Sequence, residues 1–172
     1  MKLLVLIFTL KKVPNLSWSS FDELNLKPKN KTLTYLVLGL ILFGLGETLL
    51  IAAGVGVSPW TVLAQGISVQ TEYSIGVTTF IVSIIVLCIW IPLKQKPGIG
   101  TILNTIIISI VIDLSLPHLP SPEIFVFQIL QVIIGVLIVG LGSGFYLIAN
   151  LGPGPRDGLM TGIQRKTNFS FT

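Results

Sequence analysis

Long apolar segments are the feature that most constrains how this chain can fold. Four follow one another, at residues 33–53, 75–93, 98–116 and 124–149. A helix crosses a bilayer with about 20 apolar residues, so each segment is close to or above the spanning length. Charged residues make up only 10% of the chain, whereas a soluble domain has roughly 25%. The sequence therefore predicts an all-α, multi-pass helical membrane protein in contact with the lipid bilayer.

Two short helices and an N-terminal tail complete the predicted organisation. Ser58 followed by Pro59 is a typical helix start, and apolar residues at helical spacing extend an amphipathic helix over about 59–70. A second short helix is predicted over about 155–166. We interpret residues 1–32 as a tail that is cytoplasmic or lies at the membrane interface, since the apolar run from Leu3 to Leu10 is too short to span. Residues 33–172 form the membrane domain.

The basic residues indicate the orientation. They cluster before the first span, between the second and third, and after the fourth, at Lys27, Lys29, Lys31, Lys94, Lys96, Arg156, Arg165 and Lys166. The loops at 54–73 and 117–123 contain no Lys or Arg. The positive-inside rule then makes the N-terminus cytoplasmic.

A repeat with an offset of 96 residues (140 minus 44) relates two parts of the membrane domain. Gly44, Gly46, Gly56, Pro59 and Gly66 recur as Gly140, Gly142, Gly152, Pro155 and Gly162. Chance similarity between glycine-rich helices is the alternative, but it does not account for the Gly-x-x-Pro loops keeping this offset. One unit holds three spans, so the second copy enters the membrane from the opposite side. Such inverted-topology repeats are typical of secondary transporters.

The end of the chain bears on this repeat. Thr172 corresponds to Gly76, so residues 77–116 have no counterpart in the second copy. We therefore expect the second repeat to be truncated and the chain to be a fragment of a six-span protein.

The two Gly-x-x-Pro loops are candidate helix breaks beside a substrate path. They contribute Gly56, Ser58 and Pro59 in the first copy and Gly152, Gly154 and Pro155 in the second, where Arg156 and Asp157 follow. A helix start beside an arginine can hold an anion. A nucleotide-binding P-loop is excluded, because Pro153 and Pro155 lack N–H groups and no Gly-Lys-Ser or Gly-Lys-Thr follows. A purely structural break, with a positive-inside arginine, is the simpler interpretation.

Glu47 and Asp113 are the acidic residues within spans, and both are candidates for a substrate or ion path. Asp113 ends a polar series with Thr101, Thr105 and Ser109 at i+4 spacing, with Asn104 beside it. These side chains could instead hydrogen-bond between helices. We expect Glu47 to face the helix bundle, because an unpaired charge in lipid would cost at least a few kcal/mol.

Recognisable catalytic, metal and nucleic-acid sites are missing from the sequence. His118 is the only histidine and Cys88 the only cysteine, so we expect no catalytic residues, no metal site and no cofactor. The basic residues form no stripe with aromatics, which argues against nucleic-acid binding. Gly140 and Gly144 are predicted to allow close helix packing.

Three motifs carry a resemblance to a known family. Residues 56–60 (GVSPW), 92–100 (PLKQKPGIG) and 141–162 (LGSGFYLIANLGPGPRDGLMTG) resemble the YczE/YitT type of bacterial integral membrane protein. The resemblance covers the chain from about Gly39 onward and implies a place in the bacterial cytoplasmic membrane. It assigns no catalytic residues, because the activity of that family is largely unassigned. Its members extend further at the C-terminus.

Two functions remain open. The first is a permease-like carrier of an unknown small solute, which should have a polar cavity between the repeats. The second is a membrane accessory or assembly protein that transports nothing, whose polar side chains should be satisfied by neighbouring helices. An intramembrane enzyme is disfavoured. Further copies of the chain are candidate partners.

Overall fold

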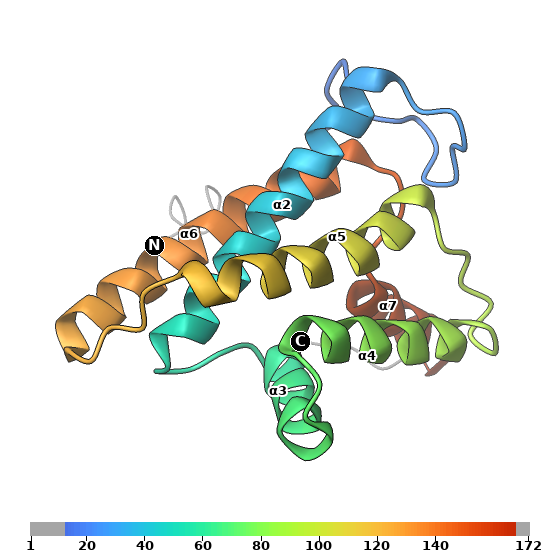
Figure 1. Cartoon of the computed structure of the whole chain (residues 1–172). Helices are drawn as coiled ribbons and strands as arrows, with labels where there is room; N and C mark the ends of the chain where they lie inside the picture. The colour runs from blue at the N-terminus through green and yellow to red at the C-terminus, as the bar shows by residue number, and fades with distance from the viewer. Residues whose placement is uncertain (1–12, 168–172) are drawn as a thin grey trace, which may run out of the picture.

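The computed structural model describes residues 13–167, and this part of the chain is helical with no strand. Six α-helices and one 3-10 turn follow one another (Figure 1). They are α2 (Asn30–Ala53), α3 (Pro59–Thr71), α4 (Ile75–Trp90), α5 (Ile99–Ser115), η1 (Leu116–His118), α6 (Phe125–Ala149) and α7 (Pro155–Thr167). The apolar run at residues 3–10 lies outside the described residues.

The helix ends lie close to those predicted because local capping signals set them. Ser58 and Ser74 each accept a hydrogen bond from the backbone N–H three residues on, at the starts of α3 and α4. The helix α2 ends at Gly54 in the left-handed conformation. The largest difference is at the end of α4, which stops at Trp90 rather than near residue 93. Pro92 has no N–H to continue the helix.

Spanning capacity differs among the helices. Residues 30–53, 99–118 and 125–149 form three helices long and apolar enough to cross a membrane. The helix α4 has 16 residues, about 24 Å at 1.5 Å per residue, and a bend of 115° separates it from α3. The described chain therefore has three candidate spans, or four if the bent pair α3–α4 counts as one.

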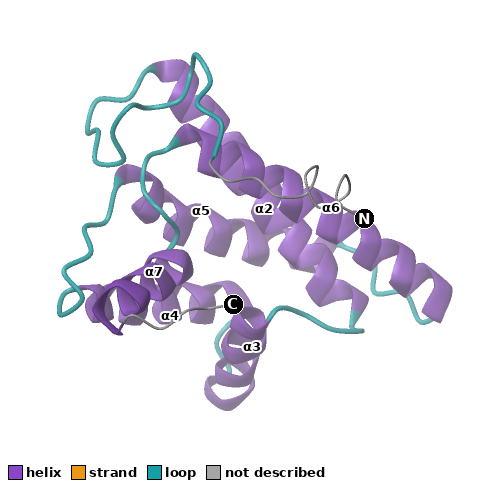
Figure 2. Ribbon diagram, turned by 180° about the vertical axis from the view of Figure 1, so that it is seen from behind, coloured by secondary structure: helices purple, strands orange, loops and turns teal. Residues whose placement is uncertain are grey.

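Glycines bring α2 and α6 into close antiparallel contact, and the two helices lie side by side in both views (Figures 1 and 2). A Cβ added at Gly39 would lie 2.9 Å from the Gly142 oxygen. One added at Gly46 would lie 2.8 Å from the Gly135 oxygen. The prediction for Gly140 and Gly144 was wrong, because an added Cβ at either meets no atom within 4 Å. Those two glycines lie away from α2.

The remaining helices pack around this pair. The helix α5 contacts both α2 and α4, while α4 also contacts α3 and α7 (Figure 2). A core of buried residues joins α2, α5 and the end of α6, namely Leu36, Leu40, Ile108, Ile112, Tyr146, Ala149 and Leu151. The outer face of α6 is apolar and uncovered, and Leu137 is 68% exposed. Burial of such surface in lipid is favourable by roughly 25 cal/mol per Å².

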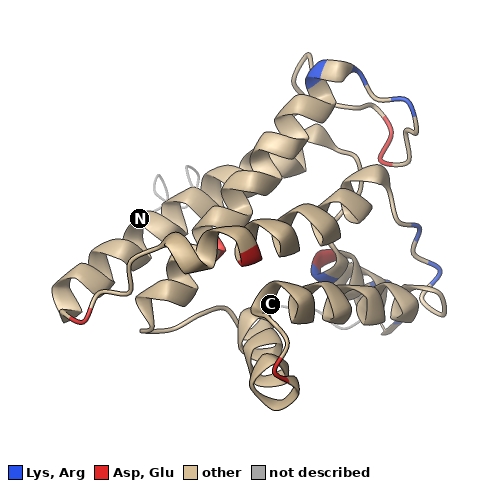
Figure 3. Cartoon of the chain, viewed as in Figure 1, with Lys and Arg blue, Asp and Glu red and all other residues tan. Residues whose placement is uncertain are grey.

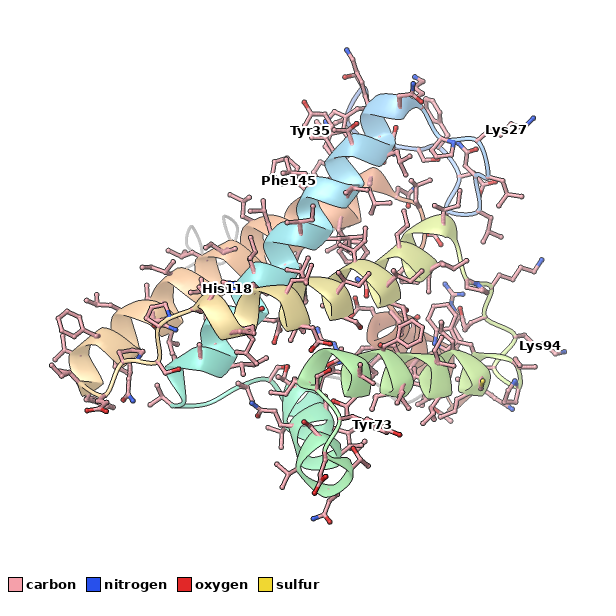
Figure 4. All side chains as sticks on the ribbon, viewed as in Figure 1. Lys27, Tyr35, Tyr73, Lys94, His118 and Phe145 are labelled. Carbon is pink, nitrogen blue, oxygen red and sulfur yellow. The ribbon has the colours of Figure 1, made fainter. Side chains whose placement is uncertain are left out.

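Charge is distributed unevenly along the bundle. Lys and Arg gather toward one end and its neighbouring loops, except on α7, where blue also marks the middle of the molecule (Figure 3). Lys27 and Lys94 lie at this end, while Tyr73 and His118 lie on the other side of the molecule (Figure 4). Near the Lys27 end, Tyr35 stacks on Phe145 with ring centroids 5.8 Å apart. Tyr and Trp side chains of this kind are typical of the membrane–water boundary.

Two stretches of backbone have matching geometry 96 residues apart. Gly54 and Asn150 both close a helix in the left-handed conformation. Their N–H groups donate to Ile51 and Leu147, which are also separated by the offset. The helices α3 and α7 then start at Pro59 and Pro155 and are both 13 residues long. The membrane topology of this repeat remains a prediction.

Candidate functional site

A cavity of about 60 Å³ lies among the helices and is lined by residues from α2 to α7. A water needs roughly 10–15 Å³ on this measure, so the cavity holds a few waters or one small ion in this conformation. Its walls combine apolar side chains, such as Phe43 and Ile108, with polar ones. We describe this cavity, the lining of which includes Glu47, Asn104, Arg156 and Asp157, as the candidate site.

Glu47 reaches the cavity from α2. Glu47 is 7% exposed, as expected for a carboxylate that faces the bundle. The Thr61 hydroxyl, in the first turn of α3, donates to Glu47 Oε2 at 2.8 Å. Ser58 supports this arrangement, because its Oγ lies 2.9 Å from the Thr61 hydroxyl oxygen. Within residues 13–167, Glu47 Oε1 accepts no hydrogen bond.

This environment stabilises the Glu47 charge only in part. Transfer of an ion into a protein interior costs several kcal/mol. The start of α3 provides the positive end of a helix dipole, which contributes about 0.3–1 kcal/mol to a nearby carboxylate. A hydrogen bond to a charged group contributes about 1.5–3 kcal/mol. Arg156, another lining residue, also attracts Glu47 but pairs with Asp157. The Glu47 charge is therefore only partly balanced.

Hydroxyl groups from α4 and α5 line another part of the cavity. Four side chains contribute these hydroxyls, and each hydroxyl donates to the backbone carbonyl four residues earlier on its own helix, at 2.7–3.1 Å. They are Thr79, Ser83, Thr105 and Ser109. A hydroxyl has one hydrogen and two lone pairs, so these groups have used their donor and keep acceptor capacity.

The first turn of α7 closes the cavity on a further side. Tyr146 is buried in α6, and its hydroxyl donates to Asp157 Oδ2 at 3.1 Å and accepts the Gly154 N–H. Asp157 Oδ1 lies 3.5 Å from Arg156 Nε. Asp157 thus has both a positive neighbour and a hydroxyl donor. The Asn104 amide lies close by, because a Cβ added at Gly154 would be 3.3 Å from its nitrogen.

The loop before α7 is fixed from two sides. The Thr101 hydroxyl donates to the Pro153 carbonyl at 2.7 Å, and the Trp90 indole N–H donates to the Pro155 carbonyl at 3.0 Å. The Pro153 and Pro155 carbonyls therefore attach this loop to α5 and α4. The Trp90 ring also lies directly over Gly158, leaving no room for a side chain there.

Asp113 occupies a different place. Its Oδ2 accepts from the Ser74 hydroxyl at 2.7 Å, and its Oδ1 accepts from the Gly76 N–H at 2.8 Å. Asp113 thus caps the start of α4 and does not line the cavity. A carboxylate at a helix start is a common stabilising arrangement.

The cavity brings together part of the predicted set. Glu47, Asn104, Arg156, Asp157, Ser58, Gly154 and Pro155 line it, whereas Asp113, Gly56, Pro59 and Gly152 do not. Their role in a substrate or ion path stays a prediction. Sequence reasoning missed Tyr146, for which no signal exists in the sequence. It also missed Thr79 and Ser83, whose i+4 spacing matches that of Thr105 and Ser109.

The lone reactive side chains form no site in the described part of the chain. His118 lies in η1, where its Nδ1 is 2.9 Å from the Leu114 carbonyl oxygen. Cys88 is exposed on α4. No group of three or more His, Cys, Asp or Glu side chains is placed to hold a metal ion among residues 13–167.

Comparison with known proteins identifies the family. Residues 30–172 match the model of a family of unknown function, DUF6198. The chain belongs to this family. An uncharacterised protein of Haemophilus influenzae is 37% identical over 159 residues, covering 92% of this chain and 72% of that protein. No solved structure matches the chain.

Two relatives come from Bacillus subtilis. The uncharacterised membrane protein YczE is 32% identical over 139 residues, or 80% of this chain. The uncharacterised protein YyaS is 30% identical over 130 residues, or 73% of this chain. The chain spans 65% and 64% of the lengths of these two proteins. It is thus an integral membrane protein of a family without an assigned activity, and these relatives indicate no enzyme family.

Proposed function

We propose that the chain forms part of a permease-like carrier for a small solute in the bacterial cytoplasmic membrane, with no enzymatic activity. One observation carries this proposal: residues 58–61 and 154–157, which correspond under the offset of 96, both contribute to the lining of one cavity. Helix starts from two inverted repeats that meet at a central site are typical of secondary transporters. The cavity would then be the solute site.

The contact between α2 and α6 supports an inverted repeat. Gly39 faces Gly142, and Gly46 faces Gly135. Adding 96 to Gly39 and Gly46 gives Gly135 and Gly142, so the offset converts each contact into the other. A self-complementary contact between antiparallel helices fits a pseudo-two-fold axis perpendicular to them. Such an axis would lie in the membrane plane, as inverted topology requires.

A membrane accessory or assembly protein is the second candidate. That function predicts polar side chains fully satisfied by neighbouring helices. Glu47 Oε1 and the Asn104 amide instead line a cavity, and neither has a hydrogen-bond partner among the described residues. These free groups favour the carrier. Association of the chain with further copies is compatible with either function.

Thiol accessibility distinguishes the two functions. In a Cys88→Ser background, Thr105→Cys places a thiol on the cavity wall, whereas Ile106→Cys places the next residue outside it, where the side chain is 38% exposed. A carrier exposes its cavity to water on each side in turn. We expect small, membrane-impermeant thiol reagents to label Thr105→Cys from both sides in vesicles and to leave Ile106→Cys unlabelled in lipid.

Labelling of Thr105→Cys from neither side, or from one side only, would contradict the carrier and favour the accessory protein. To identify the solute, the accumulation of each metabolite in a panel is measured in a strain that lacks the gene. The same measurement is made after the gene is restored, and the solute is the metabolite whose accumulation changes. Solutes found this way should slow the labelling of Thr105→Cys.

A further inference from the structure

The candidate cavity has more negative than positive formal charge. Glu47 and Asp157 each contribute one carboxylate, and Arg156 contributes the one guanidinium among the described lining residues. Arg156 already pairs with Asp157, which also accepts from the Tyr146 hydroxyl. The one described donor to Glu47 is the neutral Thr61 hydroxyl. The formal charges of the lining residues therefore leave one negative charge unmatched. Arg156 attracts Glu47 as well as Asp157, so one guanidinium is shared between two carboxylates.

The neutral groups of the wall favour the same kind of ligand. Thr79 and Ser83 on α4 and Thr105 and Ser109 on α5 have donated their hydrogens within their own helices. Four oxygens thus face the cavity region as acceptors, beside a carboxylate. A metal cation binds several oxygen atoms at once, and an ammonium group donates several hydrogen bonds. A proton bound to Glu47 would occupy only one of these oxygen acceptors.

The chemistry of the cavity wall limits the ligand further. A small ion with a few waters, or a primary ammonium group, fits a cavity of about 60 Å³ and can use these acceptors. A quaternary amine has no N–H group to donate to them. We propose that the cavity binds a small monovalent cation at Glu47, either an inorganic ion such as Na⁺ or the ammonium group of a solute. This inference rests on the proposed carrier function, because it names the ligand class of the same cavity.

Thermal unfolding of the full chain in detergent tests cation binding directly. Choline chloride is replaced by sodium chloride or by methylammonium chloride at constant ionic strength, so that screening does not change. A ligand that binds only the folded state raises the melting temperature, by about 3 °C or more at tenfold excess over its dissociation constant. We expect a saturating rise with Na⁺ or with methylammonium. The salt that produces the rise identifies which source the protein uses.

Two substitutions locate the site. Glu47→Gln removes the charge but keeps an oxygen for the Thr61 donor, and we expect it to abolish the cation-specific rise. Asp113→Asn is the matched control, since it neutralises a carboxylate outside the cavity and should keep the rise. If Glu47→Gln fails to fold, Glu47→Asp serves instead: it retains the charge on a shorter side chain and should need at least several-fold more cation.

Three results would overturn the inference. They are an equal melting temperature of the wild type in all three salts, a rise that persists in Glu47→Gln, and an unchanged cation requirement in Glu47→Asp. The first result would leave a proton as the partner of Glu47. The two experiments are independent, because cation binding can be measured without transport and two-sided thiol labelling can be measured without the cation. Binding without two-sided labelling would therefore reject the carrier and keep the cation site, and the reverse result would reject only the cation site.

Discussion

At the scale of single residues, α6 contains glycines of two kinds. Gly142 lies against the backbone of α2, where an added Cβ would be 2.5 Å from the Phe43 nitrogen. Gly140 lies two residues earlier, about 200° around the helix, and has no atom within 4 Å of such a Cβ. The sequence pattern shows glycines at both positions and does not reveal which of them faces a partner.

This difference gives a test of the α2–α6 contact. We expect Gly142→Ala to lower the free energy of unfolding by roughly 1–3 kcal/mol, because the added methyl group must push two backbones apart. Gly140→Ala should leave stability unchanged or raise it by up to about 1 kcal/mol, because alanine favours the helix. Denaturation of both variants in detergent measures the two values. Equal effects would show that the two helices do not meet through Gly142.

The candidate site was partly predictable for a residue-level reason. Glu47 and Asp157 are ionisable groups near or within apolar segments, where their cost makes them conspicuous. Tyr146 is one aromatic residue among many apolar ones, so its hydrogen bonds to Asp157 and Gly154 could not be anticipated. Asp113 was conspicuous for the same reason as Glu47, but it caps a helix and lies outside the cavity. A charged residue within a span therefore indicates that some group pairs with it, but the sequence does not identify that group.

At the scale of helices, α4 depends on a residue from outside itself. Ser74 caps its own helix, and Asp113 of α5 accepts from both Ser74 and Gly76. The backbone of α5 also lies so close to Gly76 that a side chain there would collide with it. The start of α4 is therefore attached to α5.

Removal of the Asp113 carboxylate should loosen this attachment. We expect Asp113→Ala to destabilise the protein by about 0.5–2 kcal/mol, the usual range for loss of a helix cap. Hydrogen exchange at the Gly76 amide should become faster. Asp113→Asn keeps one acceptor and should have an intermediate effect, while Glu123→Ala, which changes an exposed carboxylate, should have almost none. Unchanged exchange at Gly76 in Asp113→Ala would show that the cap contributes nothing.

Helix boundaries were predictable because their causes are local. Ser58, Ser74 and Pro59 act within one turn of their own position, so the starts of α3 and α4 could be placed from the sequence. The angle of 115° between these helices was not predictable. Glu72 ends α3 in the left-handed conformation, which glycine or asparagine usually adopts, and neither residue type occurs between Gln70 and Ser74.

At the scale of the whole molecule, the basic residues define one end of the bundle. The helices α2 and α5 start near it, and α4 and α6 finish near it (Figures 1 and 3). In a membrane, Lys and Arg concentrate on the cytoplasmic side. We therefore expect this end of the bundle to lie on the cytoplasmic side of the membrane.

Reporter fusions test this direction. A reporter after Tyr73 should read as external, and one after Gln95 as cytoplasmic, because these residues lie toward opposite ends of α4. Alkaline phosphatase and a fluorescent protein provide complementary readouts. A cytoplasmic reading at Tyr73 together with an external reading at Gln95 would reverse the orientation. The same reading at both sites would show that α4 does not cross.

The hydroxyl groups of α4 and α5 have a mechanical consequence. Among residues 13–167, α4 is hydrogen-bonded to other helices near its ends, through Asp113 at the start and through the Trp90 indole at the finish. Between these points, Thr79 and Ser83 bond only to carbonyls of α4 itself. Widening the gap between the middles of α4 and α5 therefore breaks packing contacts but no hydrogen bond. The wall of the cavity is polar enough to admit water, and no hydrogen bond between the middles of the two helices opposes its widening.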